Sequence, residues 1–365
     1  MSGESRIRQL LTRAVDEGVF PGAVFLVARC RQVFFFEAAG NAALLPTPWP
    51  MTRETRFDLA SLTKPLATTL AVLYLMSQGK LHLDAPLADL LAGVPVPADR
   101  EKITLRQLLC HCSGLPAWRP YYLSVGTVPG KACKAQLREQ ILREPLDCAP
   151  GTRSVYSDLG FLLIQWIVEQ ASGHELHHFI HKHLFAPLGC ATLGYLPLDS
   201  EKENDPHDFA ATEFCAWRGR ILCGQVHDEN AYVLGGVAGH AGLFGTASEV
   251  MCVLNVLLDT LASRSVPLPW SRDDLLQFLR PAGIDPHSTW ALGFDTPAAS
   301  GSSTGHHFSP ETVGHLGFTG TSFWLDLRRE MAVILLSNRI HPLRANQKIR
   351  GFRPLLHDAI MEEFG

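Results

Sequence analysis

The chain has 365 residues, of which 46% are hydrophobic and 19% are charged, and its formal net charge is −4. This length accommodates one large domain or two closely joined domains with an ample core. The small negative charge and the lack of any run of Lys and Arg argue against nucleic acid as the main partner, and no stretch reaches the roughly eighteen uninterrupted apolar residues of a membrane span.

The first 18 residues are polar but carry apolar side chains at helical spacing, which predicts an amphipathic helix. These apolar positions are Ile7, Leu10, Leu11, Ala14 and Val15. Neither the apolar core nor the cleavage site of a signal peptide is visible, and nine scattered cysteines are typical of reduced thiols. We therefore expect a cytoplasmic protein, or a periplasmic one if a leader precedes the given sequence.

A buried helix is predicted from Leu62 to Gln78, because this stretch is mostly apolar and Gly79 terminates it. Pro65 has no backbone N–H and therefore belongs in the first helical turn. The helix must begin near Ser61, where free N–H groups and the helix dipole favour negative charge.

Lys64 lies three residues after Ser61 on the same helical face and can reach its hydroxyl. A serine becomes an effective nucleophile when a base takes its proton, and a lysine can be that base when burial keeps part of its population neutral. The alternative is a capping serine beside a lysine that extends its ammonium to solvent. The Ser-x-x-Lys pattern alone does not decide between the two.

Tyr156-Ser157-Asp158 precedes a second apolar helix, predicted at 159–171. Tyr156 is either a core residue with a bonded hydroxyl or a second proton-transfer group beside Lys64. Asp158 is either a polar group at the edge of the site or a helix N-cap.

His174-Glu175-Leu176-His177-His178 matches the zinc-protease pattern His-Glu-x-x-His. The apolar side chains of this segment share one helix face, whereas His174, His178 and His181 share the opposite, solvent-side face. A catalytic zinc needs a dry pocket and a third ligand, and the sequence indicates neither. We expect no metal and no cofactor, so a zinc peptidase acting through His174, Glu175 and His178 is a remote alternative.

The glycine-rich stretch 235–245 lacks the spacing of a phosphate loop, and we expect it to let backbone pass close to a pocket. The polar cluster His227-Asp228-Glu229-Asn230 just precedes it. We expect His227 and Asn230 to line the same pocket and bind substrate. Cys110-His111-Cys112 has no second Cys/His pair placed to complete a metal site, which indicates a structural role.

Strand-like sequence occurs near both chain ends, at 22–37 and 312–338, with helices between. This order predicts an α+β fold, an antiparallel sheet flanked by helices with a large helical insertion. We expect residues 1–57 and 288–365 to form the sheet domain and 58–287 a mainly helical domain, with the active site in the cleft between them.

The chain resembles the serine β-lactamase and penicillin-binding-protein superfamily, in particular the branch of class C β-lactamases, D-Ala-D-Ala carboxypeptidases and related esterases. The family's Ser-x-x-Lys falls on Ser61 and Lys64, and its Tyr-x-Asn element falls on Tyr156 and Asp158. Its Lys/His-Thr-Gly strand falls on 315–317. The likeness extends over nearly the whole chain.

This resemblance implies a two-step acyl transfer in which Ser61 attacks a carbonyl and water then hydrolyses the acyl-enzyme. Lys64 and Tyr156 would share the base and acid roles as a coupled pair. His315 would orient Tyr156 and the substrate, with a charge that depends on pH. The backbone N–H groups of Ser61 and Phe318 would hold the oxyanion.

Two departures from the family pattern bear on the substrate. His315-Leu316-Gly317 replaces Lys-Thr-Gly and lacks its fixed positive charge, although Gly317 is still expected to contact substrate. Asp158 replaces Asn and adds a negative charge that should repel a carboxylate at this substrate-binding position.

Both departures favour a small neutral ester or amide, as for a β-lactamase-like carboxylesterase. The alternatives are a D-Ala-D-Ala carboxypeptidase or penicillin-binding protein, a β-lactamase, and a non-catalytic penicillin sensor. The expected partner is a small-molecule ester, amide or D-amino peptide, and the oligomeric state is not predicted.

Overall fold

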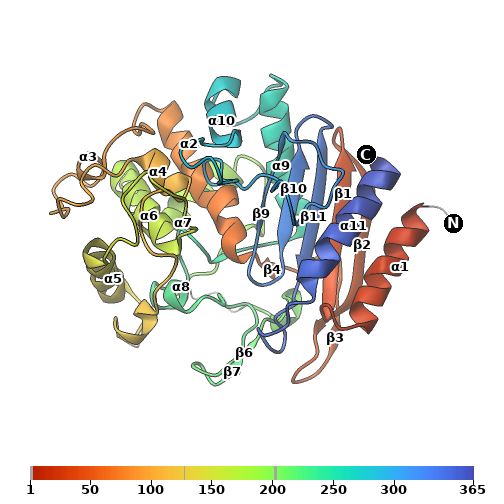
Figure 1. Cartoon of the computed structure of the whole chain (residues 1–365). Coiled ribbons are helices and arrows are strands. Elements are labelled where there is room, and N and C mark those ends of the chain that lie inside the picture. Colours follow the sequence, from red (N-terminus) through yellow and green to blue (C-terminus); the bar gives the residue numbers. More distant parts are fainter. Residues whose placement is uncertain (1–2, 127, 201–203) are drawn as a thin grey trace.

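A computed structural model describes residues 3–126, 128–200 and 204–365 of the chain. Its main sheet has six antiparallel strands in the order β3-β2-β1-β11-β10-β9 and is built from both ends of the sequence (Figure 1). The strands are β1 (Gly22–Arg29), β2 (Gln32–Ala43), β3 (Trp49–Pro50), β9 (Thr312–Leu316), β10 (Ser322–Asp326) and β11 (Met331–Ser337). The predicted α+β architecture is confirmed, whereas the division at residues 57/58 and 287/288 stays a prediction.

The two faces of the sheet are covered by different helices, because successive side chains of a strand point to opposite sides. On β1, Phe25 and Val27 pack with α1 (Gly3–Asp16) and α11 (Ile349–Phe364) in a smaller core. Val24 and Leu26 face the larger core on the other side. Figure 1 shows α1 and α11 along one face of the sheet.

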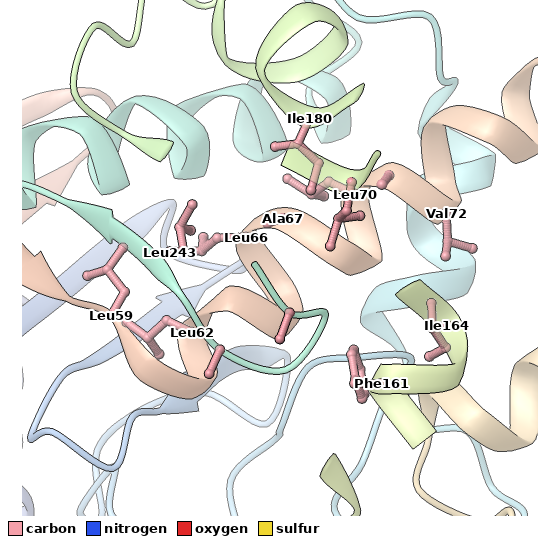
Figure 2. Packing of buried hydrophobic residues seen from close by; sticks show 14 of the residues in the cluster. Leu59, Leu62, Leu66, Ala67, Leu70, Val72, Phe161, Ile164, Ile180 and Leu243 are labelled. Atoms are coloured by element: carbon pink, nitrogen blue, oxygen red, sulfur yellow. The ribbon is translucent and has the colours of Figure 1, made fainter. Parts of the chain in front are cut away.

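The larger core is formed by helices from the middle of the chain and by the second face of the sheet. These helices are α2 (Leu70–Ser77), α3 (Leu87–Leu90), α4 (Leu105–Leu109), α5 (Lys131–Arg143), α6 (Asp158–Ser172), α7 (Leu176–Ile180), α8 (Glu229–Val233), α9 (Ala247–Leu261) and α10 (Arg272–Leu279). Helix α9 packs on β1 and β11. Figure 2 shows part of this core, where Leu66 and Leu70 of the segment after Ser61 lie among Phe161, Ile180 and Leu243.

The segment that contains Ser61 is helical, as predicted, but it is irregular at its start. A 3₁₀ turn at Ala60–Leu62 leads into a π-helical stretch at Lys64–Thr69, and regular α2 follows. Gly79 ends the helix in a left-handed conformation with φ +66°. π-Helical turns are rare and occur frequently at functional sites.

A small three-stranded sheet joins the glycine-rich stretch to the backbone just before Ser61. Its order is β4 (Phe57–Asp58), β8 (Leu243–Gly245) and β5 (Gly194–Tyr195). The remaining strands, β6 (Phe214–Cys215) and β7 (Arg220–Ile221), form a separate pair. Among the residues that the structure describes, no helix combines the length and apolar character needed to cross a bilayer.

Candidate active site

Ser61 is presented on a tight backbone turn. The preceding residue, Ala60, has φ +47°, a conformation that costs an L-residue on the order of 1–3 kcal/mol and is found mainly where the surrounding structure enforces it. Asp58 enforces it here, because its Oδ1 accepts the Ala60 N–H at 2.8 Å. Thr319 donates its hydroxyl to the Asp58 carbonyl at 2.8 Å. The loop after β9 therefore fixes the turn that carries the serine.

Lys64 lies directly behind Ser61 and is completely buried. Its ammonium donates to Ser61 Oγ at 3.0 Å, to Asp158 Oδ1 at 2.6 Å and to the His240 carbonyl at 3.3 Å. All three ammonium donors are therefore used. A lysine extended to solvent, the alternative to a catalytic one, does not fit this position.

The charge of Lys64 is set by its neighbours. Burial lowers the pKa of its ammonium, but the Asp158 carboxylate and the Tyr156 hydroxyl together outweigh burial, and the pKa lies above its ordinary value. Lys64 is therefore a cation at neutral pH. Asp158 is the first residue of α6, whose N-cap is the preceding residue, Ser157.

Tyr156 faces both Lys64 and Ser61. The Lys64 ammonium lies 4.7 Å from the centre of the tyrosine ring. Burial raises the pKa of the Tyr156 phenol, Lys64 and the hydrogen bond with Ser61 lower it, and the balance is a raised pKa. Tyr156 is therefore a neutral phenol at neutral pH, able to give a proton rather than to take one.

His111 supports the Tyr156 ring. It is buried with φ +60°, and its ring lies 4.6 Å from the Tyr156 ring and 4.5 Å from the Trp290 ring, measured between centroids. Its Nδ1 accepts the Ser157 N–H at 3.1 Å. Burial holds the His111 pKa well below its ordinary value, so the imidazole is neutral and can accept this bond.

His315 lies on β9, with its ring 6.0 Å from that of Tyr156. Its Nδ1 faces the Leu316 carbonyl at 2.8 Å, which assigns the proton to Nδ1 and leaves Nε2 unprotonated. Burial and the nearby Lys64 cation lower its pKa to about 3. The expectation that the charge of His315 varies with pH is therefore wrong for neutral conditions, because the ring stays uncharged.

Two backbone N–H groups are positioned to serve as an oxyanion hole. Within the described residues, no backbone hydrogen bond uses the N–H of Ser61 or of Phe318. Gly317 lets these two segments approach, because a Cβ there would lie 2.8 Å from the Leu59 carbonyl and 2.0 Å from Thr321 Oγ1. Gly317 is thus a position of close packing as well as part of the cavity wall.

The predicted site residues surround one cavity of about 660 Å³. Its wall includes Ser61, Tyr156, Asp158, His227, His315 and Phe318. Lys64 lies behind this wall, in contact with Ser61.

Asn230 does not line the cavity, contrary to expectation. Its side chain bonds the Tyr122 N–H at 3.0 Å and the Arg119 carbonyl at 2.8 Å, so it holds a neighbouring loop instead. His227 does line the cavity, where its ring stacks on that of Phe318.

An arginine-rich wall, which no motif predicted, lies on the side of the cavity formed after β11. Arg339, Arg350 and Arg353 contribute to it. Arg339 and Arg353 are buried and donate to backbone carbonyls only, and Arg353 Nε has no partner among the described residues. Burial and the repulsion of Arg339 lower the Arg353 pKa to about 9. Arg344 differs, because it pairs with Glu213 and Glu229.

The His-Glu-x-x-His segment does not form the helical zinc motif. Helix α7 begins at Leu176, so His174 and Glu175 precede it. The side chains that approach one another are those of Glu175, His177 and His178, and His174 is not among them. His174, His178 and His181 are exposed, as predicted.

Comparison with known proteins agrees with this geometry. Residues 7–355 match the sequence model of the family described as Beta-lactamase. A putative D-alanyl-D-alanine carboxypeptidase of Escherichia coli O157:H7 is 34% identical, over 93% of this chain and 83% of that protein. An N-acetylmuramyl-L-alanine amidase of Bacillus subtilis (strain 168) is also 34% identical, over 92% of this chain and 81% of that protein.

A solved structure shares the fold across its whole length. It is described as EstCE1, a hydrolase with promiscuous acyltransferase activity, and superposes with a TM-score of 0.71 at 23% sequence identity. The match covers 96% of this chain and 98% of that chain. The resemblance seen in the three sequence motifs is thereby confirmed, and the chain belongs to the beta-lactamase family of hydrolases.

Proposed function

We propose that this hydrolase works through an acyl-enzyme on Ser61. The observation that carries the proposal is the buried Lys64 ammonium, which contacts the Ser61 hydroxyl and the Asp158 carboxylate at once. Ser61 attacks the substrate carbonyl, and the N–H groups of Ser61 and Phe318 stabilise the oxyanion, each contributing about 3 kcal/mol.

The proton of Ser61 leaves through Lys64 to Asp158. Because Lys64 is held as a cation, it accepts the serine proton only as it passes one of its own protons to Asp158. Lys64 therefore stays charged, and the Asp158 carboxylate becomes a carboxylic acid. This relay keeps positive charge beside the oxyanion throughout the attack.

Tyr156 completes the cycle as the acid for the leaving group. Its neutral phenol gives a proton to the departing amine or alcohol as the bond to the carbonyl carbon breaks, and it recovers a proton from the Lys64–Asp158 pair. Water then attacks the acyl-enzyme by the reverse route, which releases the acid product and restores Ser61.

We propose an amide or ester with a nearby anionic group as the substrate. The relatives named as a carboxypeptidase and an amidase favour an amide bond. The Asp158 charge, expected from the sequence to repel a carboxylate, is paired with Lys64. Arg350 and Arg353 instead present positive charge to the cavity. The neutral-ester esterase remains the second candidate, because the wall also offers the aromatic rings of Trp118 and Trp290.

The test compares acylation and turnover on matched substrates. Wild type and Ser61→Ala are mixed with acetyl-D-alanyl-D-alanine, its neutral C-terminal amide, N-acetylmuramyl-L-alanine and p-nitrophenyl butyrate, with product release and intact protein mass as readouts. We expect the carboxylate substrates to be preferred, Ser61→Ala to be inactive, and Arg350→Gln to raise KM for the carboxylates only. Turnover that survives Ser61→Ala contradicts the mechanism, and a preference for the neutral amide or butyrate supports the esterase instead.

A further inference from the structure

A second cavity, of about 470 Å³, lies away from the catalytic residues, between α9, α10 and the first residues of β9. Figure 1 shows α9 and α10 on the same side of the molecule, beside the β9 end of the sheet. A volume of this size falls within the range of about 300–1,000 Å³ typical of small-molecule pockets. None of the residues assigned to catalysis contributes to its wall.

The floor of this cavity is apolar. Five leucines from three different elements line it: Leu258, Leu261, Leu276, Leu279 and Leu327. Leu258 and Leu279 are almost completely buried, whereas Leu261, Leu276 and Leu327 are only partly buried. The partly buried side chains leave apolar surface that an aliphatic chain can cover.

The rim of the cavity is predominantly cationic. Arg272, Arg280 and Arg328 lie on it, against two acidic residues, Glu311 and Glu330. Glu330 lies 3.5 Å from Arg264, which is outside the lining, so its charge is already compensated. Arg280 and Arg328 are exposed, and neither forms an ion pair within the described residues. The rim therefore carries unmatched positive charge.

A buried polar atom without a partner lies between the floor and the rim. The Thr312 side chain is completely buried and its Oγ1 has no hydrogen-bond partner among the described residues. Such a hydroxyl costs about 1–3 kcal/mol unless something satisfies it. The register of β9 and β10 pairs Thr312 with Asp326, two residues before Arg328. The Asp326 carboxylate does not fill this role, because it bonds Ser309 and Arg329.

We propose that this cavity binds a monocarboxylate with an aliphatic tail of medium length. The tail lies on the leucine floor, and the carboxylate accepts a hydrogen bond from Thr312 Oγ1 and faces the Arg328 side of the rim. This proposal concerns a site separate from the hydrolytic one and does not depend on the mechanism proposed for Ser61.

Calorimetric titration of the full chain with decanoate tests the proposal, with decyltrimethylammonium as a probe of equal tail length and opposite charge. We expect decanoate to bind and the cation not to bind. Arg328→Gln should weaken decanoate binding about fivefold, as for a partly exposed charge pair. Thr312→Val should weaken it about tenfold or more, because a hydrogen bond to a charged group is lost.

Two sets of controls make the outcome decisive. Arg153→Gln removes an exposed arginine outside both cavities, and Arg350→Gln removes one from the catalytic cavity; both should bind decanoate like wild type. Thr312→Ser keeps the hydroxyl and should keep the affinity, and Thr312→Val should fold at least as stably as wild type because it removes an unsatisfied group. Absent binding, equal binding of both probes, or a loss with Arg350→Gln in place of Arg328→Gln overturns the proposal.

Discussion

Replacing Asp158 by Asn tests how the charge of Lys64 is maintained. The variant keeps the shape of the side chain but removes the carboxylate that lies 2.6 Å from the ammonium. Lys64 is 0% exposed and Asp158 18% exposed, so this is a buried pair, and removal of one partner of such a pair costs about 3–5 kcal/mol. The loss has an upper bound, because Lys64 can release its proton. From pH 7 to its ordinary pKa of 10.5, at about 1.36 kcal/mol per unit, that bound is about 5 kcal/mol.

The pH dependence of stability gives the sharper readout. In the wild type the folded-state pKa of Lys64 is raised, so its stabilising contribution is complete below the ordinary value of 10.5 and is lost as pH rises through the folded-state pKa. In Asp158→Asn burial is no longer opposed by the carboxylate, the folded-state pKa falls, and stability should instead rise with pH. The difference in unfolding free energy between the two proteins, measured by urea denaturation from pH 6 to 10.5, should therefore narrow toward the alkaline end.

The same variant separates two roles of Asp158 in catalysis. If Asp158 takes the serine proton through Lys64, Asp158→Asn should lower kcat by about 100-fold or more. Wild-type stability at pH 7 would refute the ion-pair reasoning. Wild-type kcat with reduced stability would refute the relay alone and would assign the proton to a neutral Lys64.

Three further substitutions probe the support of the site. Gly317→Ala places a Cβ 2.8 Å from the Leu59 carbonyl and should cost about 1–3 kcal/mol and most of the activity, whereas Gly351→Ala, which meets no neighbour, should fold normally, as urea denaturation and turnover would show. Because the pKa of His315 is about 3, His315→Gln should lower kcat without moving any limb of the kcat/KM profile between pH 5 and 8; a displaced limb contradicts a neutral imidazole. His111→Gln removes the ring that stacks on the catalytic phenol and should lower kcat about tenfold with KM unchanged, whereas a matching rise in KM would indicate a substrate contact.

The start of the serine helix was predictable because the signals are local. Pro65 and Gly79 bracket the segment, and the structure places its helical turns between them. The left-handed conformation of Ala60 was not predictable, because it depends on hydrogen bonds with Asp58, itself held by Thr319, which is distant in sequence. Tertiary contacts of this kind leave no pattern in the residues that they constrain.

Sequence proximity misled the analysis where local geometry turns a side chain away. Asn230 follows His227 by three residues, but Asp228 caps the short helix α8 through the Ala231 N–H at 2.7 Å. The cap begins the helix after Asp228, and Asn230 then bonds the neighbouring loop instead of facing the cavity. The arginine-rich wall was missed for a different reason, since its members are spread over 339–353 without a recognisable spacing.

The charge balance of the cavity depends on which groups are paired, and composition alone does not reveal that. The acidic residues on its wall are largely compensated, because Asp158 pairs with Lys64, Asp228 lies 3.0 Å from His240, and Glu229 contacts Arg344.

Arg350 and Arg353 have no such compensation from the described residues, and the lowered pKa of Arg353 reflects a buried cation that lacks an acidic partner. A neutral substrate would leave that charge unmatched in the closed complex, whereas a carboxylate would match it. The substitution of Asp for Asn in the Tyr-x-Asn element therefore adjusts the proton chemistry of Lys64 and does not exclude anionic substrates from the site.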